Sequence, residues 1–363
     1  MLITFPHMGD MSIVLKTLFN GLGRQVSVPP PISKRTLELG MKYSPETVCL
    51  PFKVNVGNFI EALEQGADTI VTCGGVGPCR LGYYAEIQRS ILQDLGFRFD
   101  MIVVEPAITN ILKNLHRVAP KQSLPNIYSA FRLATAKMNT LDSLQQKVYR
   151  LQPREINPGE ADSVRLQGVR EIDTAETLTA LAAVRQETES KLDSVKLRSG
   201  IQPLRIGIVG EIYVMLEPFM NQDLASHLGN MGVEVHQTMF LSDYVNGHLF
   251  RKQEYLKLFQ HLAALAQPYL RHTIGGHSLK SIGHTVNMGR KNFDGVIHIF
   301  PFTCMPEIVA KNILPKVSSD ANIPVLSLTF DEQSGEAGLM TRLEAFVDLL
   351  KYRRSSQTAA DPD

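Results

Sequence analysis

Short apolar segments alternate with amphipathic segments over the first hundred residues. The apolar segments have the length of buried strands and are expected at Leu2–Phe5, Gln25–Val28, Asp68–Thr72 and Met101–Val104. A further short strand is expected to lead into Cys49, and a helix is expected over Val54–Gln65, with Gly66 as its stop. Because strands and helices alternate, this part of the chain predicts a doubly wound parallel sheet.

The pattern changes after Val104. From Pro106 to about Gly200, helical periodicity dominates and strand signals vanish. The expected helices are rich in Ala, Leu, Gln, Glu, Lys and Arg, which favour the helical state, and lie near Ile108–Val118, Leu124–Leu151 and Thr174–Val195. This middle part is therefore interpreted as a helical insert that joins two α/β lobes.

Alternation of strands and helices resumes at Leu204. Strands are expected at the start of LRIGIVGEIYV and at Glu234–Phe240, Gly295–Phe300 and Val325–Phe330. Helices are expected at Pro218–Met231, Lys252–Leu265, Ile282–Gly289, Glu307–Ile313 and Thr341–Tyr352. The predicted fold is α/β, with two Rossmann-like lobes of mainly parallel sheets (1–105 and 204–352), the helical insert (106–203) and a disordered tail (353–363).

Composition and charge narrow the functional classes. The chain has 363 residues and a formal net charge of +1, so its charge favours neither nucleic acid nor an anionic membrane as a partner. No apolar run approaches the length of a transmembrane helix, and the segment MLITFPHMGD has no signal-type core. A cytoplasmic location is expected. Neither GxGxxG nor GxxxxGK[ST] occurs, so a dinucleotide fingerprint and a P-loop are unsupported.

The candidate chemistry lies in the cysteines. Cys49, Cys79 and Cys304 are each expected just past the end of a strand and ahead of a helix. Such strand ends share one edge of a parallel sheet, where ligands bind, and helix N-termini stabilise thiolates. Disulfides are rare in the cytoplasm, so these residues are interpreted as metal ligands or reactive thiols, with small apolar filling of strand ends as the alternative. The spacings fit no zinc finger or ribbon and no compact ferredoxin run.

Residues near the cysteines are candidates for further roles. Lys53 and Arg80 place positive charge at helix starts, which an anionic cluster or a CoA phosphate would favour; the alternative is solvated surface charge. Tyr84 is a candidate hydrogen-bond donor to a cofactor, or a packing residue. Glu211 and Tyr213, in the turn after a strand, are the candidate catalytic groups, and Glu211 is alternatively an N-cap.

Several motifs resemble the 2-hydroxyacyl-CoA dehydratase component superfamily, in particular its stand-alone branch of activase-related (CoA-activase-like) proteins. The matching stretches are FPHMG, TLELG, SPETVCLPFKVNVGNFIEALEQGAD, GPCRLGYY, VGEIYV, PFTCMPE and DEQSGEAGLMTRLEAF. The resemblance implies two lobes that hold an oxygen-sensitive [4Fe-4S] cluster through three cysteines, which on this sequence are Cys49, Cys79 and Cys304. It also implies an ATP-dependent activase as electron donor and a second dehydratase-like subunit or a homodimer.

The implied function is that of an iron–sulfur protein. It would carry out low-potential one-electron reduction of a small bound substrate, or electron transfer, and as an enzyme would be an (R)-2-hydroxyacyl-CoA dehydratase-like lyase or an ATP-coupled reductase component. Cys73 has no counterpart in the three-cysteine pattern. The sequence leaves three roles open for it: a fourth cluster ligand, a thiolate beside the cluster, or a residue that fills the core. The alternatives are a non-catalytic cluster-bearing regulator or assembly partner, and a metal-free α/β binding protein.

Overall fold

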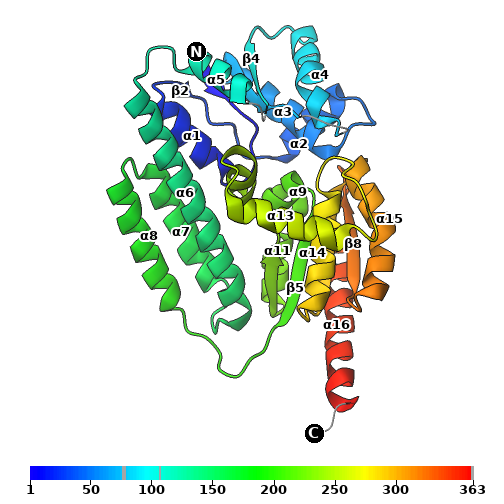
Figure 1. Ribbon diagram of the computed structural model, residues 1–363. Coiled ribbons are helices and arrows are strands. Elements are labelled where there is room, and N and C mark those ends of the chain that lie inside the picture. Colours follow the sequence, from blue (N-terminus) through cyan, green and yellow to red (C-terminus); the bar gives the residue numbers. More distant parts are fainter. Residues whose placement is uncertain (76–78, 106–107, 361–363) are drawn as a thin grey trace.

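Two parallel β-sheets organise the molecule. The computed structural model describes residues 1–75, 79–105 and 108–360. The first sheet has the order β2-β1-β3-β4, and its strands are β1 (Leu2–Thr4), β2 (Gln25–Val26), β3 (Thr69–Cys73) and β4 (Asp100–Val104). The second has the order β6-β5-β7-β8, with β5 (Leu204–Gly210), β6 (Val233–Gln237), β7 (Gly295–Pro301) and β8 (Val325–Phe330). The predicted α/β fold with two lobes is confirmed (Figure 1).

Apolar runs explain why the central strands pair as they do. All seven residues of β7 are buried, and β3 is buried except at Cys73. Parallel strands are covered by helices on both faces, which requires such continuous apolar runs rather than an alternating pattern. In the register of the paired strands, Ile70 lies opposite Met101 in the first sheet and Val209 lies opposite His298 in the second.

The helices of the N-terminal lobe differ from the prediction around Cys49. They are α1 (Met11–Gly21), α2 (Lys34–Tyr43), α3 (Leu50–Glu64) and α4 (Leu81–Asp94). The expected strand before Cys49 is absent, so this cysteine follows a turn after α2 rather than a strand. Helix α3 begins at Leu50, four residues earlier than predicted, because Pro51 suits a first helical turn, where no backbone N–H is needed.

Helix α3 is buried along almost its whole length. Its residues from Leu50 to Leu63 are all buried, including Lys53, Asn55 and Asn58. The side chain of Asn58 donates to the carbonyl oxygen of Pro30 and accepts from the backbone N–H of His7. The polar side chains of α3 therefore hold neighbouring loops rather than face solvent.

Helices fill the chain between β4 and β5. They are α5 (Ile108–Val118), α6 (Leu124–Leu151), η1 (Gln152–Arg154), α7 (Glu160–Thr174) and α8 (Leu178–Asp193). Among the described residues this stretch contains no strand, only an isolated bridge between Glu155 and Leu197. The helices run along one side of both lobes (Figure 1), and α6 packs against α1 and β6.

The helices of the C-terminal lobe are broken more often than predicted. They are α9 (Ile212–Leu216), α10 (Pro218–Asn221), α11 (Leu224–Asn230), α12 (Leu241–Tyr244), η2 (Val245–Leu249), α13 (Gln253–Ala266), α14 (Ser278–Arg290), α15 (Met305–Asp320) and α16 (Glu336–Ala360). The single helix expected over Pro218–Met231 is divided, because Gln222 and Asp223 adopt left-handed backbone angles. None of the described helices combines the length and hydropathy that a membrane span requires.

Helix α16 extends beyond its expected end. The prediction ended this helix at Tyr352 and made 353–363 a disordered tail, whereas the helix continues to Ala360. Arg354 forms an ion pair with Asp294, at 2.5 Å, and Arg353 donates to the carbonyl oxygen of Asn322, at 2.9 Å. These contacts tie the helix to the loops before β7 and β8, which explains why it does not end at Tyr352.

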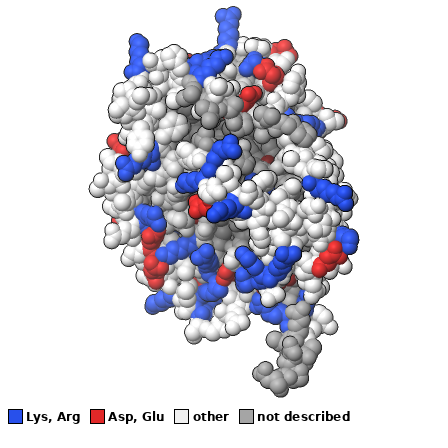
Figure 2. All heavy atoms as spheres, viewed as in Figure 1, with Lys and Arg blue, Asp and Glu red and all other residues white. Residues whose placement is uncertain are grey.

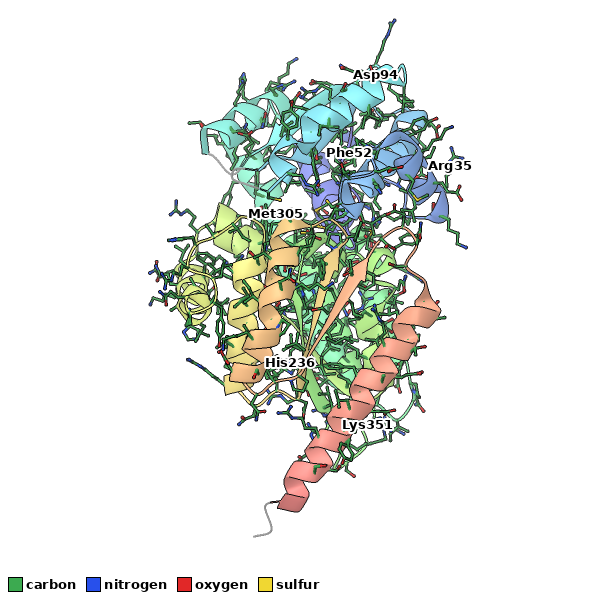
Figure 3. The ribbon with its side chains drawn as sticks, turned by 90° about the vertical axis from the view of Figure 1, so that its right-hand side faces the viewer. Arg35, Phe52, Asp94, His236, Met305 and Lys351 are labelled. Carbon is green, nitrogen blue, oxygen red and sulfur yellow. The ribbon has the colours of Figure 1, made fainter. Side chains whose placement is uncertain are left out.

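The carboxyl ends of the two sheets face each other. The backbone N–H of Gly9, after β1, donates to Glu217 at 2.6 Å, and Arg80, after the loop that follows β3, donates to the carbonyl oxygen of Thr303 at 2.6 Å. Phe52 and Met305 lie on opposite sides of this junction (Figure 3). Lys and Arg side chains are spread over the face in Figure 2, with Asp and Glu between them.

Candidate functional site

The cysteines lie where the two carboxyl edges meet. Cys73 ends β3, Cys79 lies in the loop that follows it, and Cys304 lies in the loop after β7. In both sheets the strand order reverses between the first and third strands, and ligands of open α/β sheets bind at such a switch point. Cys79 and Cys304 occupy the same topological position, each between the third strand of its lobe and the following helix.

Arg80 holds the three predicted ligand loops together. Its Nη1 donates to the carbonyl oxygen of Thr47 at 2.8 Å, and its Nη2 donates to that of Thr303 at 2.6 Å. Thr47 precedes Cys49 by two residues, Thr303 directly precedes Cys304, and Arg80 itself directly follows Cys79. One guanidinium thus connects loops from both lobes.

The two thiols at helix starts are partly buried. Cys49 Sγ lies 2.7 Å from the hydroxyl oxygen of Tyr84, and burial raises the pKa of the Cys49 thiol to about 11. Burial also raises the pKa of Cys304, and the negative charges of Glu211 and Glu307 add to this effect. The charge of Cys49 makes a smaller contribution in the same direction. Without a nearby cation both thiols are protonated at neutral pH.

Cys49 and Cys304 share a local sequence and a local structure. Each is the N-cap of a helix and starts a Cys-x-Pro segment, with Pro51 and Pro306 in the first turn. Neither sulfur forms a capping hydrogen bond. The backbone N–H of the third helical residue, Phe52 or Glu307, nevertheless opposes part of the rise in the pKa of each thiol. Both sulfurs therefore lie where a helix start stabilises negative charge.

Cys73 and Cys79 lie close to Tyr244, which comes from α12 in the other lobe. Burial raises the pKa of Tyr244, and the two thiols add to the shift. Cys73 is exposed and Cys79 is partly buried. No group of three or more His, Cys, Asp or Glu side chains among the described residues is already arranged to hold a metal ion.

Two carboxylates stand beside the Cys304 thiol. Glu211 caps α9 by accepting from the backbone N–H of Val214 at 3.0 Å, and burial with the nearby charge of Glu307 raises its pKa to about 7. Glu307 is fully buried; its Oε2 lies 2.9 Å from His298 Nε2 and accepts from Ser281 at 3.0 Å. Its other oxygen, Oε1, has no hydrogen-bond partner within the described part of the chain.

The remaining predicted residues are engaged in contacts between the lobes. Lys53 forms an ion pair with Glu332 at 2.8 Å and is almost completely buried. The hydroxyl oxygen of Tyr213 lies 2.5 Å from the carbonyl oxygen of His7 and 2.9 Å from Asn55 Oδ1, and its single proton is shared between these two acceptors. Both side chains thus join the lobes, and Tyr213 has its hydroxyl proton committed to these acceptors.

Other residues at the junction escaped the sequence analysis. Glu217 is buried and contacts His7 Nδ1 at 3.0 Å as well as the N–H of Gly9. Glu307 lies in the first turn of α15, where an acidic residue is common, and it is the buried partner of His298. Contacts between residues some two hundred positions apart leave no periodic signal, so only the folded structure reveals Glu217.

The raised pKa of Glu211 predicts a pH-dependent stability. A carboxyl whose pKa is raised from 4.5 to about 7 in the folded state favours folding below pH 4.5, and this contribution is lost as the pH rises through 7. The Glu211→Gln substitution retains the capping oxygen but does not titrate. We expect the metal-free variant to gain up to about 3 kcal/mol relative to wild type between pH 5 and pH 8.

Urea denaturation at several pH values measures this difference. The control is Glu86→Gln, since Glu86 is 52% exposed on α4 and forms its ion pair with Arg89 of the same helix. An unchanged gap between wild type and Glu211→Gln over this pH range would contradict the prediction.

Comparison with known proteins gives one partial match. Residues 7–72 match the family model described as a CoA enzyme activase uncharacterised domain (DUF2229). No curated protein matches the chain. The matched segment runs from the loop after β1 to the end of β3 and includes α3 and Cys49. The match supports a relation to activase-associated domains over this segment, and does not extend to the dehydratase component superfamily that the motifs resemble.

Proposed function

We propose that the chain binds a [4Fe-4S] cluster in the cleft between the lobes, with Cys49, Cys79 and Cys304 as ligands. The observation that carries the proposal is the pair of hydrogen bonds from Arg80, which connects the loops of all three cysteines across the junction. Iron–sulfur clusters are held by cysteine thiolates, and the cysteines that bind one cluster need not be close together in the sequence.

The chemistry of the donors fits such a group. The thiols of Cys49 and Cys304 are desolvated, which makes the free thiolates costly, and bound iron removes this cost by supplying positive charge. The backbone N–H groups of Phe52 and Glu307 favour negative charge on the same sulfurs. The Tyr84 hydroxyl, now against Cys49, remains within reach of the ligand sulfur.

A bound cluster would supply low-potential one-electron chemistry. Around it, Tyr84 holds the Cys49 sulfur, Arg80 holds the loops, and Glu211 retains or releases a proton near neutral pH. The proposed role is to receive an electron from an ATP-dependent activase-type donor and deliver it to a small bound substrate, such as an acyl-CoA thioester, or to a partner subunit. As an enzyme the protein would be an (R)-2-hydroxyacyl-CoA dehydratase-like lyase or a reductase component.

A metal-free binding protein is the second candidate. The hydrogen bond between Cys49 and Tyr84 favours it, because it satisfies one thiol without a metal. A cluster requires the sulfurs to come together into an arrangement that the described side chains have not adopted.

Iron and acid-labile sulfide in anaerobically purified protein distinguish the two candidates. We expect about four of each per chain, with an EPR signal after reduction, as for a [4Fe-4S] protein. Folded protein that holds no iron after anaerobic reconstitution with iron and sulfide would rule out the cluster. Acyl-CoA added to the reduced protein then separates a substrate-binding enzyme, whose EPR signal changes, from a cluster-bearing regulator or assembly partner, whose signal does not.

The hydrogen bonds of Arg80 lead to a prediction about how firmly the cluster is bound. Arg80→Gln removes the charge and at least one of the two hydrogen bonds, so the loops of Cys49 and Cys304 lose their common anchor. We expect iron to be retained at about half the wild-type level after gel filtration, with faster loss to a chelator. Arg89→Gln, in the helix that Arg80 precedes, is the control, since Arg89 forms an ion pair with Glu86 of the same helix. Equal iron loss in both variants would remove Arg80 from this role.

A further inference from the structure

The turn that leads from β7 to Cys304 contains a strained residue. The backbone N–H of Cys304 donates to the carbonyl oxygen of Pro301 at 3.1 Å, so residues 301–304 form a tight turn between the end of β7 and the start of α15. Thr303, at the third position of this turn, has a φ angle of +65°. A positive φ at the third position alone is the pattern of a type II turn, where glycine or asparagine is usual.

Threonine is an unfavourable residue for this backbone angle. Among the described residues other than glycine that have a positive φ, Thr303 is the one whose side chain branches at Cβ. Such outliers persist where the surroundings fix them, and they concentrate at functional sites. Here Arg80 Nη2 donates to the carbonyl oxygen of Thr303 at 2.6 Å, and the backbone N–H of Phe302 donates to the carbonyl oxygen of Phe330 at 2.7 Å. Both sides of the strained residue are therefore anchored.

The side chain of Thr303 does not compensate for this strain within the folded chain. Its hydroxyl oxygen, Oγ1, is buried and has no hydrogen-bond partner among the residues that the structure describes. A buried hydroxyl without a partner destabilises a fold. Glycine or asparagine would relieve the backbone angle, and valine would remove the unpaired hydroxyl, so the folded chain alone favours other residues here. The hydroxyl of Thr303 therefore points to a partner that the chain itself does not supply.

The next residue in the chain indicates what that partner is. Cys304 directly follows Thr303 and is the N-cap of α15. The Cα atoms of consecutive residues are about 3.8 Å apart, so a group bound to the Cys304 sulfur lies close to the Thr303 side chain. Hydrogen bonds to the sulfurs of an iron–sulfur cluster are one of the factors that set its reduction potential.

We propose that the hydroxyl of Thr303 donates a hydrogen bond to a sulfur of the cluster, and that the strained turn fixes this donor in place. The inference rests on the proposed function, because it requires a cluster at Cys304. Thr303 is a positioning residue in this arrangement, since it binds no iron and acts through the sulfur. A donor stabilises the additional negative charge of the reduced cluster, so the hydroxyl raises the reduction potential.

The Thr303→Val substitution tests the donor, because valine keeps the branched side chain and lacks the hydroxyl. After reconstitution we expect the iron content of wild type, and a fall of about three- to tenfold in the equilibrium constant for one-electron reduction. This corresponds to a reduction potential lower by roughly 30–60 mV, measured by EPR-monitored potentiometry. Thr303→Ser retains the hydroxyl and should keep the wild-type potential. Thr17→Val is the matched control, since Thr17 of α1 also has a buried hydroxyl without a partner among the described residues.

A second measurement needs no iron. In the cluster-free chain, Thr303→Val should resist urea at least as well as wild type, because it removes an unpaired buried hydroxyl and leaves the branched shape unchanged. A clear loss of stability would show that the hydroxyl has a partner within the chain, and would overturn the proposal.

The iron content separates a failure of this inference from a failure of the proposed function. A wild-type potential in iron-loaded Thr303→Val, or an equal shift in Thr17→Val, would overturn the role of Thr303 and leave the cluster in place. A wild-type chain that holds no iron would overturn both.

Discussion

The Gly57→Ala variant is expected to lose about 3 kcal/mol of stability or more, a large part of the roughly 5–15 kcal/mol that keeps a typical protein folded. Helices α2 and α3 cross with their backbones in contact at this position. A methyl group on Gly57 would overlap the carbonyl oxygen of Thr36 and lie 2.8 Å from its carbonyl carbon. These are backbone atoms of a neighbouring helix, so no side-chain rotation relieves the clash, and the two helices must separate.

Chemical denaturation with circular dichroism measures this loss. The control is Gly338→Ala in the exposed part of α16, where an added methyl group meets nothing within 4 Å. There alanine should be neutral or stabilise by roughly 0.5–1 kcal/mol, because glycine is the poorer helix former. A Gly57→Ala protein as stable as wild type would show that α2 and α3 do not cross this closely.

Serine substitutions of the cysteines are expected to divide them into two classes. After anaerobic reconstitution, Cys49→Ser, Cys79→Ser and Cys304→Ser should each retain less than about one iron per chain, against about four in wild type. Serine is a poor ligand for the soft iron of such clusters, so the loss follows from removing a single thiolate. Cys73→Ser should retain the wild-type iron content.

Cys73 serves as the internal control for this series. It ends β3 beside the same cleft and near the same Tyr244 as Cys79, so the two substitutions alter similar surroundings. Iron loss in Cys73→Ser equal to that in the other three would make Cys73 a fourth ligand. Full iron retention in Cys304→Ser would instead remove the second lobe from the site.

Most strands could be predicted because a short apolar run in an α/β protein generally forms a buried strand. Strand β8 was predicted with its observed bounds, and β7 differed by one residue at its end. The start of α3 was missed because Thr47 and Val48 are β-branched and precede a cysteine, a pattern that also suits a strand. The end of α16 was missed because Arg353 and Arg354 are stabilised by tertiary contacts.

The position of one cysteine could be predicted from the sequence, whereas the residues around the cysteines could not. Cys304 could be placed on a sheet edge because β7 and the proline-rich turn after it have clear local signals. Glu332, which pairs with Lys53, and Tyr244, which lies near Cys73 and Cys79, come from other parts of the chain. Lys53 was expected to face an anionic cofactor, or else solvent, because positive charge is disfavoured at a helix start unless an anion lies nearby.

The buried polar contacts of α3 have a consequence for unfolding. Separating the lobes would break the ion pair of Lys53 with Glu332 and the hydrogen bond between Asn55 and Tyr213. A hydrogen bond contributes about 0.5–1.5 kcal/mol net to stability, and one that involves a charged group about 1.5–3 kcal/mol. An intermediate with one lobe folded and the other unfolded therefore lacks stabilisation that the fully folded chain has. We expect the two lobes to unfold as one cooperative unit, with a single heat-absorption peak, although each has a sheet of its own.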